Sequence, residues 1–289
     1  MTSTVSLKFL DWQPLYEEEK PFQIFINIPP DAADQRSTNL VFEDVNVEIQ
    51  DVRGALNNAL DLDSSGFQFE KHHTAVTDFT NREVVDSLYL PEIEALIREK
   101  VSGVDRVFFF DWRPDKASKK RARDRGEVID LNKLTSWLRP AMHVHIDQSP
   151  LAALNRIRLQ LPGEADHLLR GRVRIINAWR PLIDCVEDWP LAVCDGSTVR
   201  NADLVECDHV RRHYMGSTMY LKSAKEQKFY YMSKQGKDDV LLFKQFDSRR
   251  NIKGKFAPHA SFKNPTAAAD ATPRQSIEVR AFVFTYPDE

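Results

Sequence analysis

Two histidines and an aspartate have the residue types and spacing of a metal site. In the segment 141–147, Ala-Met-His-Val-His-Ile-Asp, apolar and polar residues alternate. On a β-strand, His143, His145 and Asp147 would therefore project from one face. Imidazole and carboxylate ligands without a thiolate suit Fe(II) or a similar ion, in the two-histidine, one-carboxylate arrangement. His145-x-Asp147 alone is weak evidence because short motifs have many false matches, and His143 competes with His145 as the ligand.

A third ligand has to come from a strand that is distant in sequence. His259 lies in the apolar segment 257–262, whereas His72, His73, His167, His209 and His213 lie in polar, turn-like or helical stretches. We therefore expect His259 to complete the metal site. A buried histidine of the core is the alternative interpretation.

The next segment carries a candidate anchor for a carboxylate. Arg274, Ser276, Glu278 and Arg280 alternate with other residues, so they would share one face of a strand. A guanidinium fork and a hydroxyl two residues later can together hold one carboxylate group. An exposed strand edge with charged side chains is the alternative.

Composition narrows the class of protein. The chain has 289 residues, of which 42% are hydrophobic and 29% charged, with a formal net charge of −3. The composition is ordinary for a globular protein. The small negative net charge creates no long-range electrostatic field that would attract nucleic acid. No apolar run approaches the ~18 residues that a spanning helix needs, and the first residues lack a signal-peptide pattern. We therefore expect a cytoplasmic location without a membrane partner.

Two local features leave this expectation unchanged. The three cysteines have no C-x-x-C spacing, which favours reduced thiols over disulfides or a zinc site. The stretch 113–125 is strongly basic; we interpret it as a solvated loop or lid, with nucleic-acid binding as the weaker alternative.

Strand-like segments dominate the pattern along the chain. In the first third we expect strands at 22–28 and 41–49 and a helix from 91 to 101. In the remainder, Ser149 and Pro150 predict the start of a helix that runs to about 159. The other expected strands lie at 107–110, 142–146, 172–179, 219–222, 228–232, 240–246, 256–262 and 276–286. This order predicts a mainly β sandwich or barrel with flanking helices, in a single domain 1–289 composed of an N-terminal extension, 1–105, and a core, 106–289.

The order of three motifs along the chain, His145-x-Asp147, then His259, then Arg274-x-Ser276, resembles that of the iron(II)/2-oxoglutarate oxygenase superfamily. Within it, the resemblance is to the fungal hydroxylase/desaturase family that includes gibberellin desaturase-like and cephem-methoxylase-like proteins. It rests on segments 145–150 (His-Ile-Asp-Gln-Ser-Pro), 176–182, 190–195, 242–248 and 273–280. The long basic insert between Asp111 and the H-x-D strand departs from the family pattern.

The resemblance implies a double-stranded β-helix (jelly-roll, cupin-like) core and oxidation of a small-molecule secondary metabolite. Carried over by position, His145, Asp147 and His259 would bind Fe(II), while Arg274 and Ser276 would hold the distal carboxylate of 2-oxoglutarate. Asn177 would line the cosubstrate pocket. O2 would be the oxidant, and no separate protein acid or base is implied. A homodimer, or a heterodimer with a homologous oxygenase, is compatible with the resemblance.

Two other functions remain open at this point. One is a metal-dependent, cupin-like dioxygenase or isomerase that does not use 2-oxoglutarate. The other is a non-catalytic partner subunit of a homologous oxygenase. Phosphate-binding, dinucleotide-binding and serine-hydrolase motifs are absent from the sequence, which disfavours those classes.

Overall fold

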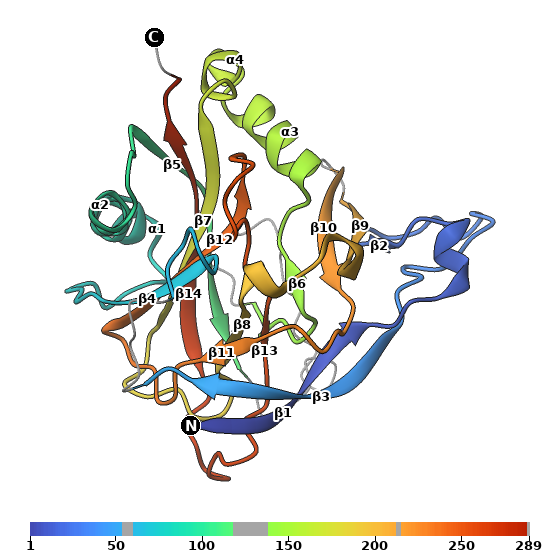
Figure 1. The fold of residues 1–289 in the computed structure, drawn as a ribbon, viewed down its shortest axis with the longest axis horizontal. Coiled ribbons are helices and arrows are strands. Elements are labelled where there is room, and N and C mark those ends of the chain that lie inside the picture. The colour runs from blue at the N-terminus through green and yellow to red at the C-terminus, as the bar shows by residue number, and fades with distance from the viewer. Residues whose placement is uncertain (54–59, 118–137, 212–214, 288–289) are drawn as a thin grey trace.

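Two β-sheets form the body of the protein (Figure 1). The computed structural model describes residues 1–53, 60–117, 138–211 and 215–287. Trp179 and Phe243 of one sheet pack with Val193 of the other in a buried cluster, so the sheets enclose a common core. No helix in these described residues is long and apolar enough to cross a membrane.

The larger sheet has nine strands in the order β1-β3-β11-β8-β13-β6-β10-β9-β2. Its N-terminal strands form a long antiparallel pair at one edge, and two very short strands lie at its centre. The strands are β1 (Thr2–Leu10), β2 (Phe22–Ile24), β3 (Phe42–Asp51), β6 (His145–Ile146), β8 (Leu191–Cys194), β9 (Leu204–Val210), β10 (Met215–Leu221), β11 (Phe229–Tyr231) and β13 (His259–Ser261).

The smaller sheet has five strands in the order β4-β12-β7-β14-β5. They are β4 (Phe67–Lys71), β5 (Arg106–Lys116), β7 (Arg172–Pro181), β12 (Asp239–Asp247) and β14 (Gln275–Thr285). All their pairings are antiparallel. β7 is buried along its whole length, as expected for a central strand covered on both faces.

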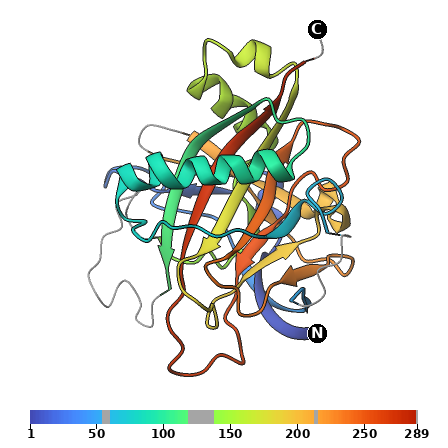
Figure 2. The ribbon, with the colours of Figure 1, turned by 90° about the vertical axis from the view of Figure 1, so that its left-hand side faces the viewer.

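Helices cover this sheet from outside. A helical stretch runs from α1 (Arg82–Val84) through a π-helical turn (Val85–Tyr89) into α2 (Leu90–Lys100). In Figure 2 α2 crosses the face of the five-stranded sheet, because Ile93, Leu96 and Ile97 share one side of the helix and are buried against it. The helix predicted at 91–101 is therefore confirmed.

A second helical unit packs on the same sheet. In α3 (Pro150–Gln160), the Ser149 hydroxyl caps the first turn by accepting a hydrogen bond from the Ala152 amide at 3.2 Å. Ile157 of α3 is buried with Phe282 of β14. A short helix, α4 (Ala165–Leu168), follows it. The helix predicted from Ser149 and Pro150 is also confirmed.

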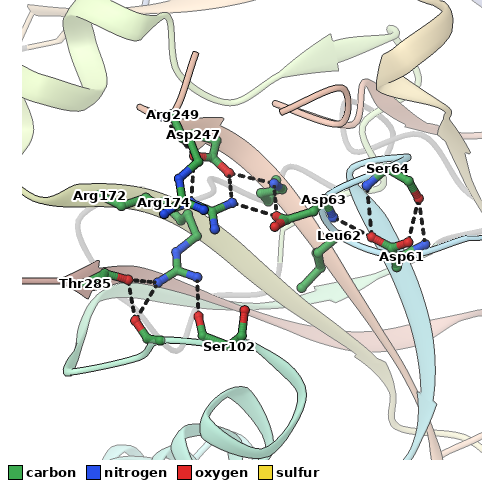
Figure 3. Close-up of polar contacts among 12 residues, drawn as sticks. Asp61, Leu62, Asp63, Ser64, Ser102, Arg172, Arg174, Asp247, Arg249 and Thr285 are labelled. Carbon is green, nitrogen blue, oxygen red and sulfur yellow. Dashed lines mark hydrogen bonds and ion pairs between the residues drawn. The ribbon is translucent and has the colours of Figure 1, made fainter. Parts of the chain in front are cut away.

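A network of charged side chains joins the N-terminal third to the core (Figure 3). Arg172 of β7 donates to Asp247 of β12 at 2.7 Å and to Asp63 at 2.6 Å. The fully buried ammonium of Lys244 reaches the same two carboxylates, at 2.7 and 3.0 Å. Two cations and two carboxylates thus neutralise one another; Asp247 and Lys244 are buried, whereas the Asp63 side chain is 44% exposed.

The mainly β architecture with flanking helices matches the expected jelly-roll core. Strands β2, β6, β11 and β13 are shorter than predicted, while β1, β4, β8 and β9 were not among the predicted strands. The strands of residues 1–105 pair within both sheets; the division into 1–105 and 106–289 stays a prediction. Most of the basic stretch 113–125 lies outside the described residues.

Candidate metal centre

The two candidate histidine ligands are direct neighbours across two strands. His259 of β13 pairs in register with His145 of β6, although 113 residues separate them in the chain. Their ring centroids are 4.4 Å apart. Asp147 follows directly after β6, on the same side as His145. Two short strands at the centre of the nine-stranded sheet therefore bring the three side chains together.

The donor atoms are arranged as a metal ion requires. One ligand atom from each of His145, Asp147 and His259 lies within 4.8 Å of the others. The Nδ1–H of His145 donates to the carbonyl of His143 at 2.8 Å, and that of His259 to the carbonyl of Ala257 at 3.3 Å. Because a carbonyl only accepts, Nδ1 of each ring is the donor in these bonds, and Nε2 is the atom that can bind a metal. This donor set fits Fe(II).

A polar shell fixes the carboxylate of Asp147. Its Oδ2 accepts a hydrogen bond from the Asn177 amide at 2.8 Å. The same oxygen forms an ion pair with Nε of Arg280 at 3.1 Å. Burial alone would raise the pKa of Asp147, but the charge of Arg280 and the hydrogen bond from His145 hold it well below its usual value. The ligand is therefore ionised and held in place.

The two histidines differ in their proton affinity. Burial, followed by the charge of His145, lowers the pKa of His259 to about 3. Burial also lowers the pKa of His145, but its hydrogen bond with Asp147 and the charge of that residue outweigh burial, so that the net shift is upward. His259 is consequently neutral over the whole physiological range.

His143 lies outside this cluster. Its ring stacks on Phe42 with the centroids 3.9 Å apart, and the group of candidate ligands includes His145 and not His143. Its contribution is instead the backbone carbonyl that orients His145. β6 begins only at His145, so the regular alternation expected for 142–146 does not extend to His143.

The predicted carboxylate anchor holds a carboxylate of the protein itself. Arg274 is buried, and its guanidinium donates to both oxygens of Asp115, while the Ser276 hydroxyl donates to Oδ1 at 2.9 Å. Nη1 of Arg274 also donates to the Trp189 carbonyl at 2.8 Å and to the Ser261 hydroxyl at 2.7 Å. Arg274 thus has the bidentate geometry that suits a carboxylate ligand.

Asn177 has a different environment from the one expected of a residue lining the cosubstrate pocket. Its amide nitrogen donates to Asp147 and, at 3.1 Å, to Glu278. It borders neither of the cavities beside the cluster. A role in binding the cosubstrate stays a prediction, and the observed contacts are those of a residue that positions Asp147.

Sequence reasoning did not identify Asp111 and Asp115. Asp111 accepts from Nη1 of Arg280 at 2.9 Å, and Asp115 occupies the Arg274 anchor. Both lie on β5, which pairs with β14 so that Asp115 faces Ser276 and Asp111 faces Arg280. Their spacing of four residues places both on one face of β5, which is a signal that could have been read.

Two cavities open beside the cluster. One of about 290 Å³ is bordered by His145 and Asp147 and extends toward α3 and β9. A smaller one of about 100 Å³ is bordered by all three candidate ligands and by Arg274 and Ser276. The candidate ligands thus border both a larger cavity and a smaller one that also includes the carboxylate anchor.

Comparisons with known proteins agree with this geometry. A protein family described as Oxidoreductase/YMDC permease-like domain matches residues 7–284. Hydroxylase/desaturase CTB9 of Cercospora beticola is 31% identical over 255 residues, which cover 84% of this chain and 77% of that protein. Aspirochlorine biosynthesis protein N of Aspergillus oryzae is 42% identical over 139 residues, covering 47% of this chain and 58% of that protein.

Similarity to a solved structure extends over nearly the whole chain. The iron and alpha-ketoglutarate-dependent endoperoxidase NvfI superposes with a TM-score of 0.82 at 28% identity, covering 99% of this chain and 98% of that one. The chain therefore belongs to the oxidoreductase family of fungal Fe(II)/2-oxoglutarate-dependent hydroxylases, desaturases and dioxygenases. The jelly-roll fold expected from the sequence is confirmed.

Proposed function

We propose that this protein is a non-haem Fe(II)/2-oxoglutarate-dependent oxygenase that oxidises a small-molecule secondary metabolite, with His145, Asp147 and His259 as the iron ligands. The observation that carries the assignment is the cluster itself, in which two imidazole groups and one fixed carboxylate converge. Three protein ligands leave the remaining coordination positions to the cosubstrate and O2. Family membership supports the same cofactor set of Fe(II), 2-oxoglutarate and O2.

Arg274 and Ser276 are proposed to anchor the distal carboxylate of 2-oxoglutarate. Their hold on Asp115 supports this role, because it demonstrates that the site accepts a carboxylate in bidentate geometry. The cavity of about 100 Å³ links this anchor to the candidate iron ligands, so a dicarboxylate can face the metal while its other end meets the guanidinium. Asp115 has to leave the anchor for this to occur.

Other residues of the chain position the ligands. Asn177 and Arg280 hold the carboxylate of Asp147, and two backbone carbonyls fix the histidine tautomers. Bound iron and 2-oxoglutarate supply O2 activation and the power to break a C–H bond, with succinate and carbon dioxide as coproducts. The protein contributes ligand geometry, an anchor and a pocket that presents one C–H bond of the substrate.

The decisive experiment measures cosubstrate use. The anaerobic protein is titrated with Fe(II) and 2-oxoglutarate, and succinate is quantified after O2 is admitted. Binding of 2-oxoglutarate that needs Fe(II), with succinate formation that needs both, supports the proposal. Iron binding without any binding of 2-oxoglutarate would instead indicate a cupin-like dioxygenase or isomerase.

A non-catalytic partner subunit would show a third pattern, in which succinate forms only after a homologous oxygenase is added. The presence of a complete ligand set favours independent catalysis. We extend the proposal to a cytoplasmic location and to a homodimer or a heterodimer with a homologous oxygenase as the candidate assemblies, which sedimentation of the purified protein tests.

A further inference from the structure

Arginines from four separate elements border the larger cavity beside the candidate iron ligands. Arg113 comes from β5, Arg156 from α3, Arg280 from β14, and Arg211 directly follows β9. Among the described residues that border this cavity of about 290 Å³, the only carboxylates are Asp111 and Asp147. Among the described residues that border this cavity, arginines therefore outnumber carboxylates.

Both carboxylates are already engaged. Asp111 accepts from Arg280 at 2.9 Å and lies 3.3 Å from Nε of Arg113, while Asp147 lies 3.1 Å from Nε of Arg280. Asp147 is also a proposed iron ligand, so its charge is shared with the metal. Arg156 and Arg211 border the cavity from α3 and from the residue after β9.

The guanidinium groups on that side rest on aromatic rings. Arg156 lies over Phe110 at 4.6 Å and Arg211 over Phe25 at 5.0 Å, measured to the ring centroids. Among the described residues, no carboxylate lies within 4.0 Å of the Arg211 guanidinium. A stacked guanidinium keeps its N–H groups directed outward in its own plane, where a planar anion can accept them.

Electrostatics agree with this geometry. Arg211 is exposed as a residue, but partial burial of its side chain, followed by the positive charges of Arg280, Arg113 and Arg156, lowers its pKa. These charges therefore act on one another across the cavity. An anion placed among them would relieve the repulsion and gain attraction from each.

Two buried polar atoms bordering the same cavity have no hydrogen-bond partner among the described residues. They are Nε2 of His209 and Oε1 of Gln148. Burial and the charge of Arg211 lower the pKa of His209 to about 4, so its ring is neutral near pH 7. Buried polar atoms are rarely left unpaired in proteins, and a polar ligand in the cavity would satisfy them.

We infer that this cavity binds the substrate and that the substrate is a small organic acid, whose carboxylate lies between Arg156 and Arg211. The inference rests on the proposed oxygenase function and specifies its substrate class. The same cavity is also bordered by His145 and Asp147. An acid held at the arginines thus presents its remaining carbon atoms toward the candidate iron ligands.

The test compares two matched probes, 2-naphthoic acid and its neutral analogue 2-naphthalenemethanol, by titration calorimetry. The protein is used both with Fe(II) and 2-oxoglutarate under anaerobic conditions and free of metal. We expect the acid to bind at least about tenfold more tightly than the alcohol, since each hydrogen bond to a charged group contributes about 1.5–3 kcal/mol. Persistence of this preference without metal excludes direct coordination by iron.

Arg156→Gln and Arg211→Gln are expected to reduce the affinity for the acid by about tenfold each and to leave that for the alcohol unchanged. Arg211→Lys should restore part of the preference because the charge remains. Arg82→Gln, which removes a largely exposed arginine of α1, is the control and should have no effect. Thermal unfolding of each variant verifies that it is folded.

Several outcomes would overturn the inference. Equal binding of acid and alcohol, no binding of the acid, or a preference that survives both glutamine variants each contradicts it. Competition between the acid and 2-oxoglutarate would assign the arginines to the cosubstrate. Failure of the proposed function is distinguishable, because it appears as loss of Fe(II)-dependent 2-oxoglutarate binding, whereas the probe preference is measured without metal.

Discussion

Asp115 and Arg274 form a bidentate pair at the base of the candidate active site. Nε of Arg274 donates to Oδ1 of Asp115 at 3.2 Å and Nη2 donates to Oδ2, while Ser276 adds a hydrogen bond. These are the two residues proposed to hold the distal carboxylate of 2-oxoglutarate. One guanidinium fork cannot serve two carboxylates, so Asp115 and the cosubstrate compete for it.

Replacement of Asp115 by asparagine should therefore strengthen cosubstrate binding. We expect the KM for 2-oxoglutarate to fall about threefold to tenfold, which corresponds to one net hydrogen bond of about 0.5–1.5 kcal/mol. The ligand-free variant should also unfold at a lower temperature, because a buried guanidinium loses its partner. Addition of Fe(II) and 2-oxoglutarate should raise its Tm more than that of the wild type.

Asp184→Asn provides the control for this variant, since Asp184 has a side chain that is 86% exposed. It should change neither quantity. A higher KM in Asp115→Asn would contradict competition and would mean that Asp115 holds Arg274 in its productive position. Arg274→Ala, in contrast, should chiefly weaken 2-oxoglutarate binding.

Loss of His259 should remove metal-dependent activity. His259→Ala deletes one of three proposed protein ligands, and we expect Fe(II)-dependent succinate formation to fall by more than about 100-fold, beyond the cost usual for removing an outer partner of a ligand. Binding of Fe(II) is measured in parallel by calorimetry. His167→Ala, which alters an exposed histidine near Tyr286, should leave both unchanged. Full activity of His259→Ala would exclude this residue from the site.

Removal of one carboxylate from the charge network of Arg172, Lys244, Asp63 and Asp247 should destabilise the protein strongly. Asp247→Asn leaves Lys244 and Arg172 with Asp63 as their one remaining shared carboxylate, and we expect the free energy of unfolding to fall by about 3–5 kcal/mol. Urea unfolding measures this change. Asp44→Asn breaks an exposed ion pair with Lys8 and should cost no more than about 1 kcal/mol. Equal losses in the two variants would contradict the assigned role.

Acid should weaken the same network. Burial alone would raise the pKa of Asp63, but hydrogen bonds from Arg172 and Lys244 lower it from 3.8 to about 2. A carboxyl group with a depressed pKa in the folded state stabilises the protein above its unfolded pKa. Its contribution is therefore complete above about pH 4 and is lost as the pH falls toward 2.

Thermal unfolding between pH 5 and 2 tests this expectation. Asp63→Asn removes the titrating group, so its Tm should decline less steeply than that of the wild type between about pH 4 and 2. Parallel curves for the two proteins would show that Asp63 does not contribute in this window.

The sequence predicted the candidate ligands because their residue types and order are local features of the chain. The alternation in 141–147, the apolar surroundings of His259 and the shared face of 274–280 all lie within single segments. It could not decide between His143 and His145, because that choice depends on where a two-residue strand begins and on the stacking of Phe42.

The features that were missed depend on pairing between distant strands. Asp115 reaches Arg274 only because β5 and β14 are adjacent and in a particular register. Strands were predicted at the positions of β6 and β13, but both proved much shorter than their sequence patterns indicated. β1, in contrast, alternates Val5, Leu7 and Phe9 with less buried residues, so its period of two was present in the sequence.

The contacts of Asp63 have a consequence for how the chain can be divided. Asp63 belongs to the first 105 residues, yet its carboxylate neutralises Arg172 and Lys244 of the second part. A shortened chain that begins at residue 106 would leave these two cations with one carboxylate and would expose the strands that β1, β2, β3 and β4 cover. We therefore expect such a fragment to aggregate, and a future engineering effort would have to preserve the N-terminal third.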